Sequence, residues 1–176
     1  METSETMLRA ARVKVMIFDV DGILTDGSLH YGPDGEAMKT FNVLDGLGIE
    51  LLQKSGVVAA IISARKSPIV VRRALDLKIL HVYQGIHDKR IAFEQLLAAT
   101  GVTDQECGYL GDDVIDFPLL LRVGFSCTVP SGHATLQQRV RYVTKANGGR
   151  GAAREVCDLI LRAQGNYDTV HAQYLA

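Results

Sequence analysis

The chain lacks the features that would place it in a membrane or on nucleic acid. A membrane-spanning helix needs roughly 18 uninterrupted apolar residues, whereas a typical apolar run here, Val57–Ile62, is bracketed by Lys54 and Arg65. There is no tryptophan, aromatic residues make up 6% of the 176 residues, and 19 basic residues nearly balance 20 acidic ones. Nucleic-acid-binding surfaces require a basic excess and stacking aromatic side chains. We therefore expect neither a membrane span nor a nucleic-acid partner.

Cysteine is also scarce, and the three cysteines, Cys107, Cys127 and Cys157, lie far apart. No two of them form the C-x-x-C pair of a zinc site, and their odd number disfavours a disulfide framework. We expect buried thiols in a reducing cytoplasm, where disulfides are rare. Residues 1–12 contain two acidic residues and no apolar core, so we expect a frayed leader or short helix there instead of a secretory signal.

What the sequence does contain is the composition and alternation of a globular α/β domain. Hydrophobic residues make up 47% and charged residues 22%, near the averages for globular proteins. Short β-rich runs alternate with amphipathic stretches, which is typical of a parallel sheet with helical crossovers. We predict strands over Val13–Phe18, Val57–Ile62, Leu80–Val82, Cys107–Leu110, Gly124–Val129 and Arg141–Thr144, and helices over Leu44–Lys54, Asp88–Ala99 and Ala152–Gln164.

One segment interrupts this alternation. Ser28–Tyr31 and Glu36–Phe41 flank the turn-forming stretch Gly32-Pro33-Asp34-Gly35, which predicts a β-hairpin inserted after the first strand. No linker, repeat or low-complexity tract is present. We predict a single α/β domain over residues 13–176, with the hairpin at 28–41 and a C-terminal helix and tail at 151–176.

The strongest chemical signal is Phe18-Asp19-Val20-Asp21-Gly22, at the end of the first predicted strand. Open α/β sheets bind ligands at the carboxyl ends of their strands, and acids clustered there are costly unless a cation neutralises them. Oxygen ligands favour Mg²⁺ over zinc or copper. An acidic turn that only caps a helix is the alternative. An EF-hand loop fits less well, because its twelfth position would be His30 instead of glutamate.

A second acidic cluster, Gly111-Asp112-Asp113-Val114-Ile115-Asp116, follows the predicted strand Cys107–Leu110. By itself it is also typical of an acid-rich helix N-terminus, but with the first cluster it supplies the remaining oxygen ligands for one metal ion. Between the clusters lie Ser63, at a strand end, and Lys89, at a helix start. A hydroxyl, backbone N–H groups and an ammonium group in such places can hold phosphate oxygens.

These residues occur in the order of a known set of motifs. Asp19-x-Asp21, Ser63, Lys89 and Gly111-Asp112-Asp113-x-x-Asp116 resemble the four motifs of the haloacid dehalogenase superfamily of phosphotransferases. Within it, FDVDGILTDGSLHYGPDGEAMKTFNVLDGLGI, YQGIHDK and GGRGAAREVCDLILRAQG resemble the 3-deoxy-D-manno-octulosonate 8-phosphate phosphatases. The resemblance covers nearly the whole chain. It departs at Ala64, in the phosphate-binding turn where glycine is expected, and at Ile23, where valine is usual. Neither departure removes a catalytic group.

The resemblance implies a Rossmann-like three-layer fold with a hairpin and no cap domain. It further implies a cytoplasmic, tetrameric, Mg²⁺-dependent phosphatase of lipopolysaccharide synthesis in Gram-negative bacteria, which hydrolyses 3-deoxy-D-manno-octulosonate 8-phosphate through an aspartyl-phosphate. In that mechanism Asp19 is the nucleophile, and Asp21 is the general acid and then the general base. The remaining implied roles are phosphoryl binding by Ser63 and Lys89, Mg²⁺ binding by Asp19, Asp21 (through its backbone carbonyl) and Asp112, and orientation of waters or Lys89 by Asp113 and Asp116.

Fewer residues bear on substrate specificity. The implied substrate is a sugar acid, and Arg65, next to Ala64 in the same turn, is placed to bind its carboxylate through two parallel hydrogen bonds. Arg150, in the stretch Gly148–Gly151, either reaches a neighbouring active site or satisfies local carbonyls. The resemblance implies that the hairpin assembles a homotetramer whose subunits cover each other's sites, and the lack of an insertion large enough for a cap agrees with this. A hairpin that is only a surface flap is the alternative.

Three other functions stay open from the sequence. A phosphatase for a nine-carbon sugar acid phosphate, of the neuraminate 9-phosphate type, would share all four motifs, although Arg65 favours the octulosonate. A signalling receiver domain would carry its phosphoacceptor aspartate after the third strand, where Leu80–Tyr83 contains no acid. A non-catalytic assembly module would have no need of the complete set of acidic and basic motif residues.

Overall fold

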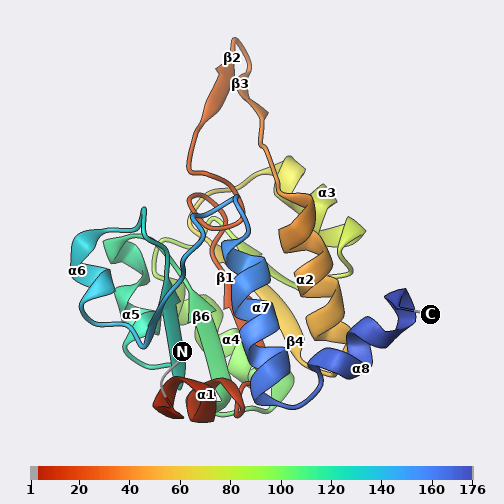
Figure 1. Ribbon diagram of the computed structural model, residues 1–176. Helices are drawn as coiled ribbons and strands as arrows, with labels where there is room; N and C mark the ends of the chain where they lie inside the picture. Colours follow the sequence, from red (N-terminus) through yellow and green to blue (C-terminus); the bar gives the residue numbers. More distant parts are fainter. Residues whose placement is uncertain (1–3, 176) are drawn as a thin grey trace.

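A six-stranded parallel sheet forms the centre of the fold (Figure 1). The computed structural model describes residues 4–175, and the strand order in this sheet is β5-β4-β1-β6-β7-β8. The strands are β1 (Val15–Phe18), β4 (Val58–Ser63), β5 (His81–Gln84), β6 (Cys107–Leu110), β7 (Phe125–Thr128) and β8 (Tyr142–Val143). All six predicted strands are confirmed, with ends that differ by no more than about two residues, as is usual for strand ends.

The side chains of β1 show how the sheet is covered. Met16 and Phe18 belong to the hydrophobic core on one face, and Val15 and Ile17 belong to the core on the other. All four side chains are buried. A strand that is buried on both faces has a continuous apolar sequence instead of an alternating one, which is the pattern that predicted this strand.

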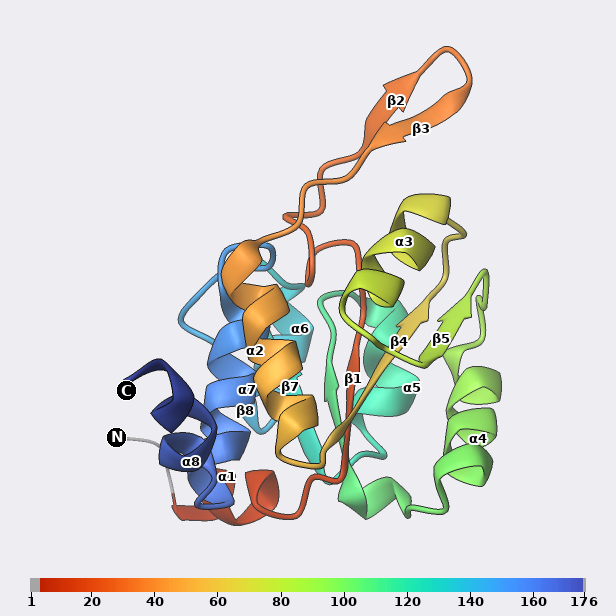
Figure 2. The same cartoon turned by 90° about the vertical axis from the view of Figure 1, so that its right-hand side faces the viewer.

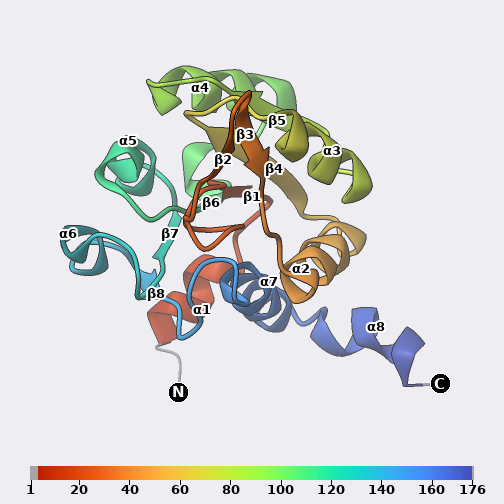
Figure 3. The same cartoon turned by 90° about the horizontal axis from the view of Figure 1, so that it is seen from above.

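Helices supply the outer layers, as a view along the sheet shows (Figure 3). The first core includes residues of α1 (Ser4–Ala10), α2 (Val43–Lys54), α3 (Pro68–Asp76), α7 (Ala152–Ala163) and α8 (Tyr167–His171). The second includes residues of α4 (Lys89–Thr100), α5 (Phe117–Leu120) and α6 (Ala134–Gln137). Short 3₁₀ helices η1 (Asp104–Glu106), η2 (Val114–Asp116) and η3 (Ala172–Tyr174) complete the chain. The predicted three-layer α/β fold is confirmed.

The predicted hairpin is also present, formed by β2 (His30–Gly32) and β3 (Gly35–Met38). It projects away from the body of the molecule beyond the start of α2 (Figure 2). Within residues 4–175 no separate cap domain covers the sheet. The hairpin, the loops and the starts of helices such as α4 therefore surround the carboxyl ends of the strands.

The two ends of the chain lie partly outside this description. Residues 1–3 of the predicted leader and residue 176 of the predicted tail are outside the described residues. Residues 4–10 form α1, in which Thr6 and Ala10 are buried. In the part of the chain that the structure describes, no helix has the length and apolar character to cross a bilayer.

Polar contacts hold the loop between β8 and α7 against α2 and against the loop after β1. Asp45 of α2 accepts hydrogen bonds from the backbone N–H groups of Gly151, at 3.3 Å, and Arg154, at 2.8 Å. The N–H of Gly149 donates to the carbonyl oxygen of Ile23 at 2.8 Å. A Cβ atom on Gly148 would lie 1.7 Å from the carbonyl oxygen of Gly22, so only glycine fits there. These contacts bring the loop before α7 onto the loop after β1.

Candidate active site

The candidate residues meet at the carboxyl ends of the central strands. Phe18, the last residue of β1, pairs with Ile61 of β4 and with Leu110 of β6. The chain runs from β1 to β4 and β5 on one side and then crosses to β6 on the other. The strand order therefore reverses at β1, and ligands of open α/β sheets bind at such a point. Asp19 and Gly111 directly follow two of these adjacent strands.

Asp19 and Lys89 form a buried ion pair at this point. Their side chains are 8% and 0% exposed, and the Lys89 Nζ atom lies 3.0 Å from Asp19 Oδ1. Burial raises the pKa of Asp19 to about 7, although Lys89 opposes this rise. Burial lowers the pKa of Lys89, but Asp19 and Asp116 more than offset that effect and raise it. The lysine is therefore a fixed positive charge beside a carboxylate that needs a counter-ion.

Asp116 is the second partner of Lys89, and both of its carboxylate oxygens are occupied by protein partners. Its Oδ1 atom lies 2.5 Å from Lys89 Nζ and accepts a 2.7 Å hydrogen bond from the Tyr109 hydroxyl group. Its Oδ2 atom accepts from the backbone N–H groups of Asp112 and Asp113. Tyr109 also accepts a 2.9 Å hydrogen bond from Lys89 and is fully buried. Asp116 and Tyr109 thus hold the lysine in place, and sequence reasoning did not single out Tyr109.

Asp112 completes an acidic cluster with Asp19. One carboxylate oxygen from each of Asp19, Asp112 and Asp116 lies within 4.8 Å of the others. Burial, followed by the charges of Asp19, Asp116 and Asp113, raises the pKa of Asp112 to about 7. Gly22 has a φ of +88°, and a Cβ atom there would lie 1.9 Å from Asp112 Oδ2. The loop after β1 thus leaves room for the Asp112 carboxylate only because residue 22 is glycine.

This donor set fits a hard divalent cation. Asp19 and Asp112 offer carboxylate oxygens that repel each other unless a positive charge lies between them. Oxygen-only donors suit Mg²⁺, which binds through one or two carboxylates together with substrate phosphate. The Asp116 carboxylate already accepts hydrogen bonds from Tyr109, Asp112 and Asp113 and pairs with Lys89, and its role in orienting Lys89 stays a prediction.

Ser63 and Arg65 lie in the turn after β4. The Ser63 side chain is buried, and its Oγ atom accepts a hydrogen bond from the backbone N–H of Arg65 at 3.3 Å. Ala64, between them, is half-buried. One terminal nitrogen of the Arg65 guanidinium donates a 2.6 Å hydrogen bond to the hydroxyl of Tyr31 on the hairpin. The turn therefore contacts both the sheet edge and the hairpin.

Asp21 has partners that sequence reasoning missed. Its Oδ1 atom forms a short ion pair with Lys39, and its Oδ2 atom lies 3.7 Å from Arg65 Nε. Lys39 also lies 2.8 Å from Glu36 Oε1, and its side chain is only 2% exposed. A lysine and a glutamate three residues apart at the end of a polar hairpin strand look like solvated surface residues. No local signal showed that they fold back onto Asp21.

Two predicted site residues lie at the margin of the cluster. Asp113 is exposed, and its Oδ1 atom caps η2 by accepting a 2.7 Å hydrogen bond from Val114 N. Its role in orienting waters or Lys89 stays a prediction. Arg150 is exposed, with a terminal nitrogen 3.5 Å from Asp26 Oδ2 in the loop after β1. Arg150 is therefore near the site loops but extends toward solvent.

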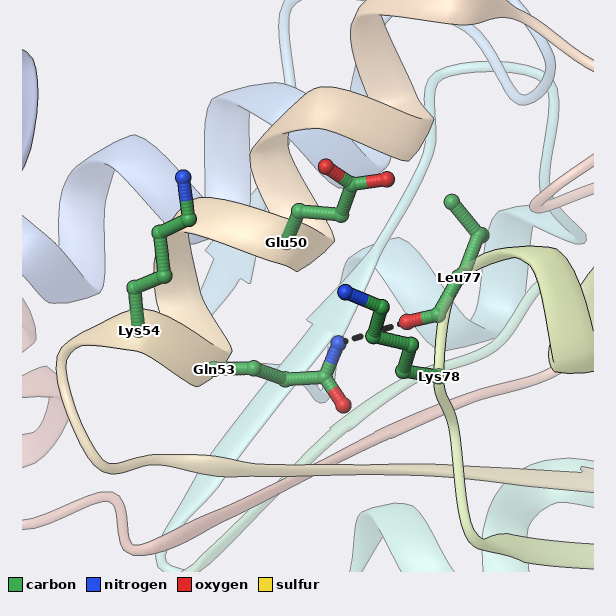
Figure 4. Close-up of a pocket in the computed structure, with 5 residues that line it drawn as sticks. All are labelled: Glu50, Gln53, Lys54, Leu77 and Lys78. Atoms are coloured by element: carbon green, nitrogen blue, oxygen red, sulfur yellow. Dashed lines mark hydrogen bonds between the residues drawn. The ribbon is translucent and has the colours of Figure 1, made fainter.

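A cavity of about 330 Å³ lies elsewhere, between the end of α2 and the turn after α3 (Figure 4). Its lining residues are Glu50, Gln53, Lys54, Leu77 and Lys78. These residues come just before β4 and β5 and so lie at the amino ends of the strands, whereas Asp19 follows the carboxyl end of β1. None of the predicted site residues lines this cavity.

Comparison with known proteins identifies relatives over nearly the whole chain. Residues 49–156 match the haloacid dehalogenase-like hydrolases. The 3-deoxy-D-manno-octulosonate 8-phosphate phosphatase KdsC of Escherichia coli (strain B / BL21-DE3) is 44% identical over 171 residues, which cover 97% of this chain and 91% of the relative.

Solved structures agree with this sequence similarity. The crystal structure of 3-deoxy-D-manno-octulosonate 8-phosphate phosphatase from Moraxella catarrhalis, in complex with magnesium ion, phosphate ion and KDO, superimposes with a TM-score of 0.95 at 41% identity and covers 98% of this chain and 99% of that one. The cobalt-bound phosphatase of the same substrate from Haemophilus influenzae gives a TM-score of 0.91 at 40% identity, with 96% and 99% covered.

Proposed function

We propose, from the premise that this chain belongs to the haloacid dehalogenase-like hydrolases, that it hydrolyses 3-deoxy-D-manno-octulosonate 8-phosphate to the free sugar acid and phosphate. It is a phosphoric monoester hydrolase, and its cofactor is Mg²⁺. The observation that carries this function is the cluster of buried Asp19 and Lys89 with half-buried Asp112 at the carboxyl ends of the strands. The chain is similar to octulosonate 8-phosphate phosphatases over nearly its full length.

In the proposed mechanism the Asp19 carboxylate attacks phosphorus, and the bond from phosphorus to the sugar oxygen breaks. Lys89, 3.0 Å away, favours the ionised form of Asp19 that this attack needs. Asp21 gives its proton to the departing sugar oxygen and then takes a proton from the water that hydrolyses the aspartyl-phosphate. One carboxylate cannot be both the nucleophile and the proton carrier, so both acids are required.

The remaining residues hold the phosphoryl group while it is transferred. The Ser63 hydroxyl and the Lys89 ammonium bind its oxygens, and charge stabilisation of this kind supplies most of the rate. The Asp19 and Asp112 carboxylates and the Asp21 backbone carbonyl would hold Mg²⁺, which would supply positive charge against the phosphoryl oxygens. The saturated carboxylate of Asp116 keeps Lys89 in position, and Asp113 supports this cluster from its exposed side.

We assign substrate specificity to the turn of Ala64 and Arg65. In the described part of the chain, Arg65 Nε is the one buried side-chain nitrogen or oxygen atom without a hydrogen-bond partner. A buried donor in this state needs an acceptor, and the carboxylate of a sugar acid supplies two. Arg150 is a further candidate, since its 71% exposed side chain is free to reach a neighbouring subunit.

The hydrolase domain, residues 13–176, is proposed to assemble as a homotetramer. Without a cap, the site is open to water, which would compete for the aspartyl-phosphate. The projecting hairpin exposes apolar side chains, with Tyr31 63% and Met38 51% exposed, and Val43 at the start of α2 is 79% exposed. Exposed apolar groups of this kind are typical of protein–protein contacts. Neighbouring hairpins would then cover each site.

We place the enzyme in the cytoplasm, as a step of lipopolysaccharide synthesis. The three cysteines are free and buried, and burial raises the pKa of Cys107 to about 12, so this thiol stays protonated. Unpaired, unreactive thiols fit a reducing compartment.

The decisive experiment measures Mg²⁺-dependent phosphate release from octulosonate 8-phosphate, neuraminate 9-phosphate and p-nitrophenyl phosphate. We expect strong preference for the octulosonate, and loss of activity on chelation and in Asp19→Asn. Preference for the nine-carbon acid would overturn the assignment of Arg65 but keep the mechanism. No metal-dependent release by folded protein would refute the proposed function.

A further inference from the structure

Lys39 is a buried lysine on an otherwise exposed hairpin. The two residues on either side of it, Met38 and Thr40, are exposed, but the Lys39 side chain is 2% exposed. A charged ammonium group removed from water is costly unless carboxylates pair with it. Asp21 and Glu36 are those carboxylates, and they raise the pKa of Lys39 against the opposing effect of burial. The lysine is therefore a charged, fixed group.

The partners of Lys39 form a chain from the body of the protein to Asp21. The Ser67 side chain, which caps α3, donates a short hydrogen bond to Glu36 Oε2. Glu36 Oε1 lies 2.8 Å from Lys39 Nζ, which in turn contacts Asp21 Oδ1. Ser67 is itself fixed, since its backbone N–H donates to the Gln84 side chain at 2.8 Å. Asp21 Oδ1 is thus linked to the start of α3 across the hairpin.

This arrangement leaves the two oxygens of Asp21 in different states. Oδ1 is engaged by Lys39, whereas Oδ2 is 3.7 Å from Arg65 Nε, which is beyond hydrogen-bond distance. Lys39 is almost fully enclosed and Arg65 is 40% exposed, so Arg65, not Lys39, is the cation that is open to a substrate. Lys39 therefore contacts side chains of the protein, and Arg65 is the cation available to a substrate.

We infer that Lys39 is a positioning residue, which fixes the Asp21 carboxylate so that its Oδ2 atom carries the proton to and from the reacting oxygens. Glu36 and Lys39 lie on the hairpin, so the contacts from Ser67 through these two residues to Asp21 form only when the hairpin is in this position. Proton transfer by Asp21 therefore depends on where the hairpin lies. The inference rests on the proposed function, because it assigns a task to the general acid of that reaction.

The test compares two leaving groups in Lys39→Met, which keeps an unbranched side chain, one heavy atom shorter, and removes its charge. A sugar alkoxide needs a proton to depart, whereas p-nitrophenolate does not. General acid catalysis contributes about 10²–10⁴-fold, so we expect kcat/KM for octulosonate 8-phosphate to fall roughly 100-fold and that for p-nitrophenyl phosphate to fall less than about 10-fold. This ratio reports the phosphoryl-transfer step and would not respond to a general loss of folded protein.

Matched variants keep the test decisive. Lys14→Met removes the exposed Lys14–Glu106 ion pair, of 2.6 Å, and should leave the ratio unchanged. Lys39→Arg keeps the charge and should restore much of the ratio. If Lys39→Met does not fold, the ratio in Glu36→Gln decides, since this variant loosens Lys39 without removing it.

Two results would overturn the inference. Equal losses for both substrates in folded Lys39→Met or Glu36→Gln would assign these residues a structural role only, and unchanged activity would assign them none. Both results require an active wild-type enzyme and leave the proposed function intact. A wild-type protein inactive on both substrates would refute the function and this inference together.

Discussion

At the scale of single residues, the site brings together two carboxylates, Asp19 and Asp112, whose negative charges repel each other. The pKa values of Asp19 and Asp112 are both raised to about 7, first by burial. In the unfolded chain an aspartate has a pKa near 3.8, so between about pH 4 and pH 7 the folded protein binds more protons than the unfolded one. Stability in the absence of metal therefore falls as the pH rises through this window. This mutual repulsion is the reason for proposing the pair as a cation site.

Asp112→Asn separates this electrostatic cost from the metal-binding benefit. Without metal at pH 8, we expect the variant to be more stable than the wild type by on the order of 1 kcal/mol, because it removes one buried charge. Excess Mg²⁺ should stabilise the wild type by about 2.7 kcal/mol at 100 times its Kd, and the variant by much less. Urea unfolding with and without Mg²⁺ measures both effects.

The same charges make Mg²⁺ binding pH-dependent. Below about pH 7 the cation must displace protons from Asp19 and Asp112, so its affinity should increase from pH 6 to pH 8. Calorimetry in buffers of different ionisation enthalpy should detect the released protons. Equal affinity and no proton release across this range would contradict the assignment of both carboxylates as ligands.

At the scale of elements, α2 and α7 are joined by a cap that one helix provides for the other. Asp45, buried in α2, accepts hydrogen bonds from the backbone N–H of Gly151, the residue before α7, and from that of Arg154 in its first turn. Backbone N–H groups at a helix start have no partners within the helix. Burial raises the pKa of Asp45, against the lowering effect of these hydrogen bonds. The N–H groups at the start of α7 therefore require a hydrogen-bond acceptor at residue 45 more than they require a negative charge there.

Two substitutions at this position separate acceptor from charge. Asp45→Ala leaves the N–H groups unpaired and should cost about 1–2 kcal/mol of unfolding free energy. Asp45→Asn keeps a carbonyl oxygen and removes the buried charge, so we expect a smaller loss. Urea denaturation midpoints give the comparison. Equal losses in the two variants would show that charge, not hydrogen bonding, joins the helices.

At the scale of the whole molecule, the uncapped site and the projecting hairpin (Figure 2) belong together. The hairpin bears Tyr31, which contacts Arg65, and Lys39, which contacts Asp21. Its exposed apolar residues, Tyr31 and Met38, are the surface through which we propose that subunits assemble. Assembly and active-site geometry would then depend on the same segment.

Met38→Glu places a charge on the exposed surface of the hairpin and tests this dependence. We expect the mass in solution, measured by light scattering, to fall below that of a tetramer, together with lower kcat/KM for the sugar phosphate. Leu80→Glu is the matched control. Leu80 is 88% exposed and lies just before β5, at the amino ends of the strands, whereas the hairpin lies at their carboxyl ends. A Met38→Glu protein that stays tetrameric would count against assembly through the hairpin, and a fully active monomer would count against the dependence of the active site on assembly.

Much of this fold could be read from local patterns. The apolar run of β1, the turn residues of the hairpin and the order of the acidic and basic motifs each depend on neighbouring residues, and such patterns report local structure directly. The cluster of Asp19, Lys89 and Asp112 was predictable for a related reason, because the carboxyl ends of parallel strands meet at one edge.

Other features depended on which distant elements pack together. Lys39 is 18 residues from Asp21, and Asp45 is 109 residues from Arg154. On sequence alone the first is a surface lysine and the second an ordinary acid in a helix. Tyr109 appeared to be only a strand residue until its hydroxyl was placed against Lys89. The tertiary structure determines the partners of polar side chains, because a buried polar group must form its hydrogen bonds with the groups that the fold brings near it.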